Sequence, residues 1–367
     1  MGVLRLVLAL SVVAAHAGDY WPTALSGVGG SVAVEIFFVM SGFYMALVLS
    51  RTYAGRSKAF LLNRGLRIYP EYWLVAVGAL VFGELNGANW LGQLASLPSA
   101  AIAILIVANT AIFGSSAVMF LQVNYQGVDF GPFLESNPPL FTLLLLPQAW
   151  TLAMELIFYI LAPWLVRRST CLIAVVVVAL FGCKILVAGF ILQLPDPWTN
   201  RFIVFELAYF LAGILLFRYW STRKEQWTFQ RAGKGSWIPL AIAGTIVLIA
   251  PWIHQFGYQY GSFVSEYLTP LILVASFAVL IPALFSATRS SKWDSRVGEF
   301  SYPVYLSHLL ALGMLSALGT RVFLNSGFTF AAALVLVFST AWVVVAFGHR
   351  LDHIRDRVRG EPSPIRE

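Results

Sequence analysis

The sequence contains few charged residues. Aspartate, glutamate, lysine and arginine make up 11% of its 367 residues, whereas 59% are hydrophobic. A soluble globular domain carries about 25% charged residues, so this composition excludes one. The apolar residues come in repeated long runs, without the short alternation that is typical of barrel strands. The composition therefore predicts a polytopic helical membrane protein.

Cysteine is scarce as well. The only two cysteines, Cys171 and Cys183, fall in one apolar segment, which excludes a disulfide framework and a cysteine-based metal site. The sequence also lacks a glycine-rich phosphate loop, His/Cys metal-ligand spacing and a nucleophile elbow. We therefore expect no metal, no ATP hydrolysis and no hydrolase-fold catalysis.

The net charge of +7 is confined to a few loops and the tail. This distribution is typical of the signal that orients a membrane protein, so we do not expect a nucleic-acid partner. By the positive-inside rule all of these segments should be cytoplasmic. They are Arg51 to Arg67, Arg167 and Arg168, Arg218 to Lys234, Arg289 to Arg296, and Arg350 to Arg359.

Eleven apolar runs are candidate membrane spans. They lie at about 2–17, 29–50, 66–83, 95–114, 148–166, 171–193, 202–217, 237–253, 266–286, 300–317 and 328–347. We predict an all-α bundle of ten to twelve crossings with both termini cytoplasmic. Residues 1–350 would form the membrane domain and residues 351–367 a cytoplasmic tail.

Two parts of this topology have alternatives. Residues 84–149 must cross the membrane an even number of times, so the run at 95–114 either pairs with a short crossing at 138–148 or is re-entrant. At the N-terminus, Ala15-His16-Ala17 fits the cleavage pattern of a secretory signal. The basic flank is weak, however, and nothing downstream resembles a secreted domain, which favours an uncleaved first helix.

Two ionisable residues are expected near the outer ends of helices one and two. His16 ends the first apolar run, and Glu35 lies about two turns into the second from the same side. A carboxylate that holds an imidazole in one tautomer makes it a better general base. The alternative is an interfacial histidine and a glutamate that stabilises helix packing.

Two arginines lie at the inner end of helix three. Arg64 and Arg67 are one turn apart, so both guanidinium groups can bind one anion, and phosphates suit such a pair. The positive-inside rule explains arginines at this position equally well.

Two further motifs combine polar and aromatic side chains. Trp150, Glu155 and Tyr159 follow one another down a helix, where an acid flanked by aromatics could bind sugar hydroxyls. Tyr305 and His308 lie on one face of the span at 300–317. The alternatives are an aromatic belt with a helix-pairing acid, and a hydrogen-bonded packing histidine.

Taken in order, five segments resemble the successive motifs of the membrane-bound acyltransferase-3 family, and the similarity covers nearly the whole chain. They are LRLVLALSVVAAH at 4–16, EIFFVMSGF at 35–43, NRGLRIYP at 63–70, AWTLAMELIFYILAP at 149–163 and SYPVYLSHLL at 301–310. The family's bacterial members O-acetylate polysaccharides and related glycans. The segment PQAWTLAMEL is most similar to the corresponding segment of the exopolysaccharide acetyltransferases.

The resemblance implies a donor, usually acetyl-CoA, that enters from the cytoplasm, and a hydroxyl acceptor on a surface glycan or its lipid-linked precursor. The location would be the bacterial inner membrane, and helix one would be uncleaved because the family keeps its histidine there.

By position, His16 matches the family's catalytic base, with Glu35 beside it, and Arg64 and Arg67 would bind the CoA phosphates. Ser41, in the SGF element with Gly42 and Phe43, would pack closely or contact the thioester. Acceptor binding would fall to Trp150, Glu155, Tyr305 and His308.

Two departures from the family pattern stand out. Many members have aspartate where this chain has Glu35, and the closing Glu-x-Pro element is not evident in HRLDHIRDRVRG. A second hypothesis from another class is a secondary transporter or glycan exporter that uses the same ionisable residues as a relay. The chain shows no internal repeat, which weighs against that hypothesis.

Overall fold

A computed structural model describes residues 1–124, 127–131, 136, 138–191, 196–198, 200–223, 237–318 and 326–360. Two of the expected segments lie partly outside these ranges. In the basic segment at 218–234, Lys224, Arg231 and Lys234 fall outside, as do residues 361–367 of the expected tail.

The described residues are almost entirely helical, and nine of their helices are long and apolar enough to cross a membrane. The all-helical membrane fold is therefore confirmed, with one short β-hairpin added to it. The nine are α1 (Gly2–Ala17), α2 (Gly30–Ser50), α3 (Ser57–Leu85), α7 (Trp150–Leu165), α8 (Thr170–Gly182) continued by the π-helix η5 (Cys183–Ile191), α9 (Ile203–Thr222), α10 (Ile238–Gln259), η7 (Val264–Leu268) continued by α11 (Thr269–Thr288), and α14 (Ser326–His349). A further apolar helix of 17 residues, α13 (Ser301–Ala317), packs against α1 and α14. The count of ten to twelve crossings and the side of the termini stay predictions.

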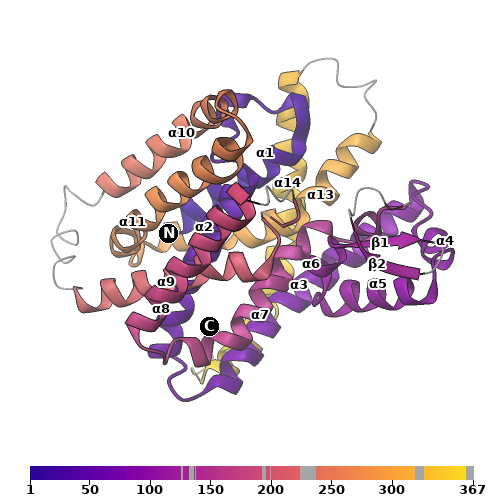
Figure 1. Ribbon diagram of the computed structural model, residues 1–367. Helices are drawn as coiled ribbons and strands as arrows, with labels where there is room; N and C mark the ends of the chain where they lie inside the picture. Colours follow the sequence, from indigo (N-terminus) through magenta and orange to yellow (C-terminus); the bar gives the residue numbers. More distant parts are fainter. Residues whose placement is uncertain are drawn as a thin grey trace.

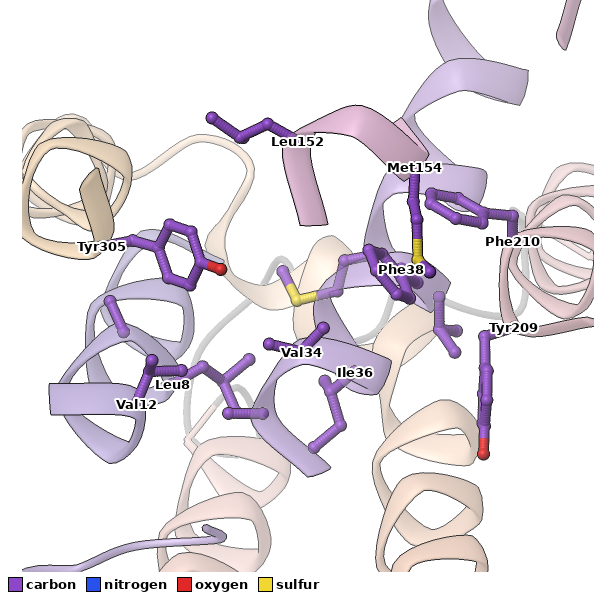
Figure 2. Close-up of a cluster of buried hydrophobic side chains, with 14 of the residues drawn as sticks. Leu8, Val12, Val34, Ile36, Phe38, Leu152, Met154, Tyr209, Phe210 and Tyr305 are labelled. Atoms are coloured by element: carbon purple, nitrogen blue, oxygen red, sulfur yellow. The ribbon is translucent and has the colours of Figure 1, made fainter. Parts of the chain in front are cut away.

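Helix α2 lies at the centre of the bundle and contacts α1, α7, α9 and α11 (Figure 1). Aromatic side chains fill the space between α2, α7 and α9. The ring of Phe210 stacks on Phe158 with centroids 4.1 Å apart and on Phe38 at 4.6 Å. Figure 2 shows Phe38, Met154 and Phe210 gathered in this core.

Glycine allows α2 and α9 to approach closely. A Cβ atom added at Gly42 would lie 2.0 Å from the carbonyl oxygen of Phe210, and one added at Gly213 would lie 2.1 Å from that of Val39. Real Cβ atoms do not approach backbone so closely, so only glycine fits at either position. Gly42, expected from the SGF element to pack closely or contact a thioester, makes this helix contact.

The segment between α3 and α7 folds around a small core of its own. It contains α4 (Trp90–Ala95), α5 (Ser99–Ala111), α6 (Ser115–Val118), the antiparallel strands β1 (Leu121–Asn124) and β2 (Gly127–Phe130), and the short 3₁₀ turns η3 (Leu140–Leu143) and η4 (Pro147–Ala149). At the end of α5, the carbonyl oxygens of Asn109 and Ala111 accept hydrogen bonds from the hydroxyls of Tyr72 and Tyr69.

Helix α5 has thirteen residues, and a full crossing needs about 20. The described residues around 138–148 form 3₁₀ turns rather than a helix. Both observations favour the re-entrant alternative for residues 84–149.

The basic segments gather at one end of the bundle. The guanidinium groups of Arg51 and Arg289 both lie over the ring of Trp220, at 5.3 and 5.8 Å from its centroid. Arg218 donates hydrogen bonds to the carbonyl oxygens of Val166 and Arg168. Segments far apart in the sequence therefore share one end, as the positive-inside rule requires of cytoplasmic loops.

Replacing Gly42 with alanine should force α2 and α9 apart and destabilise the protein by about 1–3 kcal/mol, the usual cost of overpacking. Thermal unfolding of the purified protein in detergent would measure the loss. Gly244→Ala in α10 is the matched control, because a Cβ there meets no described atom within 4 Å. Equal stability of the two variants would contradict the close contact.

Candidate active site

A cavity of about 270 Å³ lies among α1, α2, α3, α7 and α13 at the end of the bundle that carries the basic segments. Its polar lining comes from five helices: Arg5, Ser41, Tyr44, Arg64, Arg67, Glu155, Tyr159 and Tyr302. We call it the arginine cavity. It brings together Arg64, Arg67 and Ser41, three of the residues singled out in the sequence.

The three arginines of this cavity form no ion pair among the described residues, although the carboxylate of Glu155 lines the same cavity. None of Arg5, Arg64 and Arg67 forms an ion pair with another described residue. The guanidinium of Arg64 lies 5.7 and 6.0 Å from the ring centroids of Phe60 and Tyr159, and its Nε has no hydrogen-bond partner in the described structure. Three unpaired guanidinium groups in one cavity suit an anionic ligand.

Arg5 did not stand out in the sequence, because a single arginine near the start of helix one reads as a basic flank. A signal was present nonetheless. Arg5 and His16 are eleven residues apart, which is about three helical turns, so the two side chains share a face of α1 about 16 Å apart. Its position on the same helix face as His16 could therefore have identified Arg5 as a candidate site residue.

Glu155 lies in the arginine cavity, where its Oε1 accepts a hydrogen bond from the hydroxyl of Ser41. The sequence assigned Glu155 to the acceptor and Ser41 to the donor. The structure puts both in one cavity, because α7 turns this face toward α2.

His16 lies at the opposite end of α1 with an exposed ring. Its Nδ1 is 2.9 Å from the carbonyl oxygen of Val12. A carbonyl can only accept a hydrogen bond, so Nδ1 carries a proton, and in the neutral imidazole the lone pair is then on Nε2. A neutral imidazole in this tautomer can act as a general base.

A cavity of about 440 Å³ surrounds His16 and is also lined by Gln148, Trp150, Arg201 and Tyr305. We call it the histidine cavity. The guanidinium of Arg201 lies over the ring of Trp150, 4.7 Å from its centroid. Trp150 and Tyr305, both predicted to bind substrate, therefore lie beside the candidate base.

His308 supports His16 from within the bundle. It is fully buried, with its ring centroid 5.0 Å from that of His16. Its Nδ1 is 2.6 Å from the carbonyl oxygen of Tyr305, and its Nε2 has no hydrogen-bond partner among the described atoms. His308 does not line the histidine cavity, so the predicted binding of substrate by His308 becomes packing against His16.

Glu35 does not pair with His16. Its buried carboxylate accepts a hydrogen bond from Lys184 Nζ at 2.9 Å, and Lys184 also donates to Glu206 at 3.0 Å and to the Tyr209 hydroxyl at 3.2 Å. Glu35 faces α9 and η5 rather than α1. The expected orientation of His16 by Glu35 is therefore absent from the described contacts.

Lys184 was missed by the sequence reasoning. It is the one lysine within the apolar run at 171–193, and a lone cation in such a run needs a buried partner. A lone lysine in an apolar run could therefore have been identified as one half of a buried ion pair. Its partner could not be identified without knowing which helices are neighbours.

Shared lining residues show that three cavities lie next to one another in a line through the bundle. A cavity of about 70 Å³ shares Arg5, Glu155 and Tyr302 with the arginine cavity. The same small cavity shares Val34 and Tyr305 with the histidine cavity. A ligand bound by the arginines could therefore extend to His16 through this narrow part.

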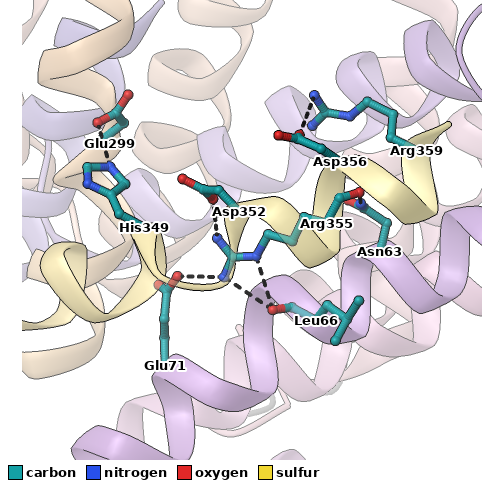
Figure 3. Close-up of polar contacts among 9 residues, drawn as sticks. All are labelled: Asn63, Leu66, Glu71, Glu299, His349, Asp352, Arg355, Asp356 and Arg359. Carbon is teal, nitrogen blue, oxygen red and sulfur yellow. Dashed lines mark hydrogen bonds and ion pairs between the residues drawn. The ribbon is translucent and has the colours of Figure 1, made fainter. Parts of the chain in front are cut away.

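Helix α15 (Asp352–Arg359) forms the wall of a further cavity of about 210 Å³, which shares Arg64, Arg67 and Tyr302 with the arginine cavity. Figure 3 shows how Arg355 fixes this helix to α3. The Arg355 guanidinium donates to Glu71 at 3.0 Å and to the carbonyl oxygen of Leu66 at 3.1 Å. Residues 352–359, expected as part of a tail, are therefore a docked helix at the mouth of the arginine cavity.

Replacing Lys184 with methionine should leave two buried carboxylates without a cation and cost about 3–5 kcal/mol of stability. Thermal unfolding in detergent would show a clear loss against Lys58→Met, whose lysine is exposed. Because a neutral cluster needs no cation, adding Glu35→Gln and Glu206→Gln to Lys184→Met should recover part of the loss. Full stability of Lys184→Met would contradict a structural role for the ion pairs.

Comparison with known proteins gives the family. Residues 1–348 match the Acyltransferase domain of the acyltransferase-3 family. The chain is 24% identical over 311 residues to the exopolysaccharide production protein ExoZ of Rhizobium meliloti, covering 83% of this chain and 84% of that protein. No solved structure matches the chain.

Two further relatives carry different names. Nodulation protein 10 of Rhizobium leguminosarum bv. viciae is 26% identical over 335 residues, which cover 86% of this chain and 83% of that protein. The peptidoglycan O-acetyltransferase OatA of Listeria monocytogenes is 26% identical over 333 residues, or 83% of this chain and 48% of that longer protein. With a family match over nearly its whole length and a multi-helix membrane fold, the chain belongs to the acyltransferase-3 family and is a membrane acyltransferase.

Proposed function

We propose that this enzyme transfers an acetyl group from cytoplasmic acetyl-CoA to a hydroxyl of a surface polysaccharide or its lipid-linked precursor, in the bacterial inner membrane. The observation that carries the proposal is the line of cavities between the three unpaired arginines and His16. The names of ExoZ and OatA support a glycan acceptor. Membership of an acyltransferase family sets the transporter hypothesis aside.

The arginine cavity is the proposed donor site. Arg64 and Arg67 line both this cavity and its mouth, so they would bind the CoA phosphates, and Arg5 would bind deeper along the donor. Glu155 and Ser41 would then lie along the pantetheine arm rather than at the acceptor. The arm would pass the narrow part of the line beside Phe37 and bring the thioester toward His16.

His16 is the proposed general base. Its Nε2 takes the proton of the acceptor hydroxyl, and the oxygen attacks the thioester carbonyl carbon. As the new C–O ester bond forms and the C–S bond breaks, CoA leaves as a thiolate and takes the proton from the imidazolium. Trp150 and Tyr305 would position the acceptor around this point, and His308 would pack behind His16.

The alternative to direct transfer is a route in which the acetyl group is first transferred to a side chain of the enzyme and then to the acceptor. Either His16 or Ser41 could accept the acetyl group first. The hydrogen bond from Ser41 to Glu155 is the arrangement that a serine nucleophile would need. Trapping of labelled acetyl on the protein in the absence of acceptor separates the two routes.

Replacing His16 with glutamine should lower acetyl transfer about 10²- to 10⁴-fold, the contribution expected of a general base. The assay follows radiolabelled acetyl from acetyl-CoA into a glycan extract, with the enzyme in native membranes. His353→Gln is the control, because His353 is exposed on α15. Full transfer by His16→Gln would rule out the assignment of the base.

Replacing Arg64 and Arg67 together with glutamine should raise the KM for acetyl-CoA while leaving the KM for the acceptor unchanged. Each charged hydrogen bond contributes about 1.5–3 kcal/mol, so a rise of about 10- to 100-fold is expected for each arginine that contacts a phosphate. Arg357→Gln is the control on an exposed arginine of α15. An unaltered KM for acetyl-CoA in the double variant would defeat the phosphate assignment.

A further inference from the structure

A further cavity, larger than those described so far, lies beside the histidine cavity. It has a volume of about 740 Å³ and is bounded by the start of α2, the end of α10 and η7. Ten of its fifteen lining residues have polar side chains: Thr23, Ser26, Ser31, Asp196, Asn200, His254, Gln255, Tyr258, Ser265 and Glu266. Gly29, before α2, and Gly30, its first residue, also line it. None of the residues assigned so far to donor, base or acceptor lines it.

The two cavities are adjacent at the start of α2. Gly30 and Ser31 line both of them. The turn before α2 is held against α10, because His254 Nε2 lies 2.8 Å from the carbonyl oxygen of Val28. Gly29 has a φ of 80°, and a Cβ there would lie 3.2 Å from the His254 ring, so glycine allows the turn to approach His254 closely. A ligand in the larger cavity could therefore present one end to His16.

The chemistry of the lining suits hydroxyl groups. Its hydroxyl, amide, imidazole and carboxylate groups include both donors and acceptors, which a polyhydroxylated ligand needs because each hydroxyl both donates and accepts. The volume falls within the range of about 300–1,000 Å³ that is typical of ligand pockets. Tyr258 adds an exposed ring on which an apolar sugar face can lie.

The charge of the lining selects against anions. No lysine or arginine lines the cavity within the described ranges, whereas Asp196 and Glu266 do. Asp196 is neutralised by Arg201, at 3.0 Å, but Glu266 forms no ion pair with a described residue. Because Arg201 is already paired with Asp196, phosphate or carboxylate groups would find no free cation among the lining residues. This argues against an acidic sugar and against the headgroup of an anionic phospholipid.

We propose that this cavity, lined by Ser31, Asn200, Tyr258 and Glu266, is the binding site for the acceptor glycan, and that it selects uncharged sugars. The site holds the residues of the glycan that flank the acetylated one, and the acetylated hydroxyl reaches His16 past Gly30 and Ser31. The assignment rests on the proposed glycan acetyltransferase function, and it names the acceptor class and its location.

A binding experiment tests the site without requiring catalysis. The purified protein in lipid nanodiscs is titrated with a β-linked glucotetraose and with the matched tetrasaccharide that ends in glucuronate, both at up to millimolar concentration. We expect the neutral glycan to bind more tightly. Glu266→Lys should shift the preference toward the glucuronate glycan by about fivefold or more, since it replaces repulsion with attraction.

Asp19→Lys is the matched control, because Asp19 is exposed on the turn after α1 and lines none of the cavities described. It should leave the preference unchanged. Equal binding of both tetrasaccharides to the parent protein and to Glu266→Lys overturns the proposal. So does failure of both to bind, or a bound phospholipid that neither displaces.

A kinetic measurement separates this proposal from the function on which it rests. In the acetyl-transfer assay, Asn200→Ala and Glu266→Lys should alter the KM for acceptor at least about fivefold and leave the KM for acetyl-CoA unchanged. Transfer with an unaltered acceptor KM in both variants overturns the site but not the function. Selective glycan binding without any acetyl transfer overturns the function and leaves the site.

Discussion

The structure depends on one constraint: charged side chains inside an apolar bundle need either an opposite charge or a polar cavity. Helix α2 shows both solutions on its two sides. On one side, Glu35 pairs with Lys184, which also neutralises Glu206. On the other, Ser41 faces the arginine cavity and donates a hydrogen bond to Glu155. The paired charges hold helices together, and the unpaired ones line the space where chemistry can occur.

Whether a charged residue has a charged partner distinguishes structural residues from candidate site residues more clearly than burial does. Arg64 and Glu35 are both largely removed from solvent, yet only Glu35 has a charged partner. An arginine without such a partner is costly unless a ligand supplies the negative charge. The close contact of α2 with α9 at Gly42 and Gly213 keeps the paired side rigid, so the cavities on the other side have a fixed wall.

Much of the fold follows from the sequence, since the length and polarity of an apolar run decide whether it spans a membrane. The expected runs are long helices, apart from the run at 95–114, which became the thirteen-residue α5. That run ends where α3 supplies side-chain donors to its last carbonyl oxygens, a contact that no local pattern contains. Helix α15 is a similar case. Its charged sequence is typical of a solvated tail, and only the tertiary structure shows the ion pair between Arg355 and Glu71 that docks it.

The sequence by itself determined the membrane-spanning helical class, the residue types of the candidate site and the placement of Arg64 and Arg67 on one helix face. These follow from composition and from the helical repeat, which are local properties. Only the tertiary structure decided that Glu35 pairs with Lys184, that Arg5 and Glu155 join the arginine cavity, and that shared residues connect this cavity to His16. The reason is that the repeat fixes which residues share a face, whereas the rotation and neighbours of each helix fix what that face meets.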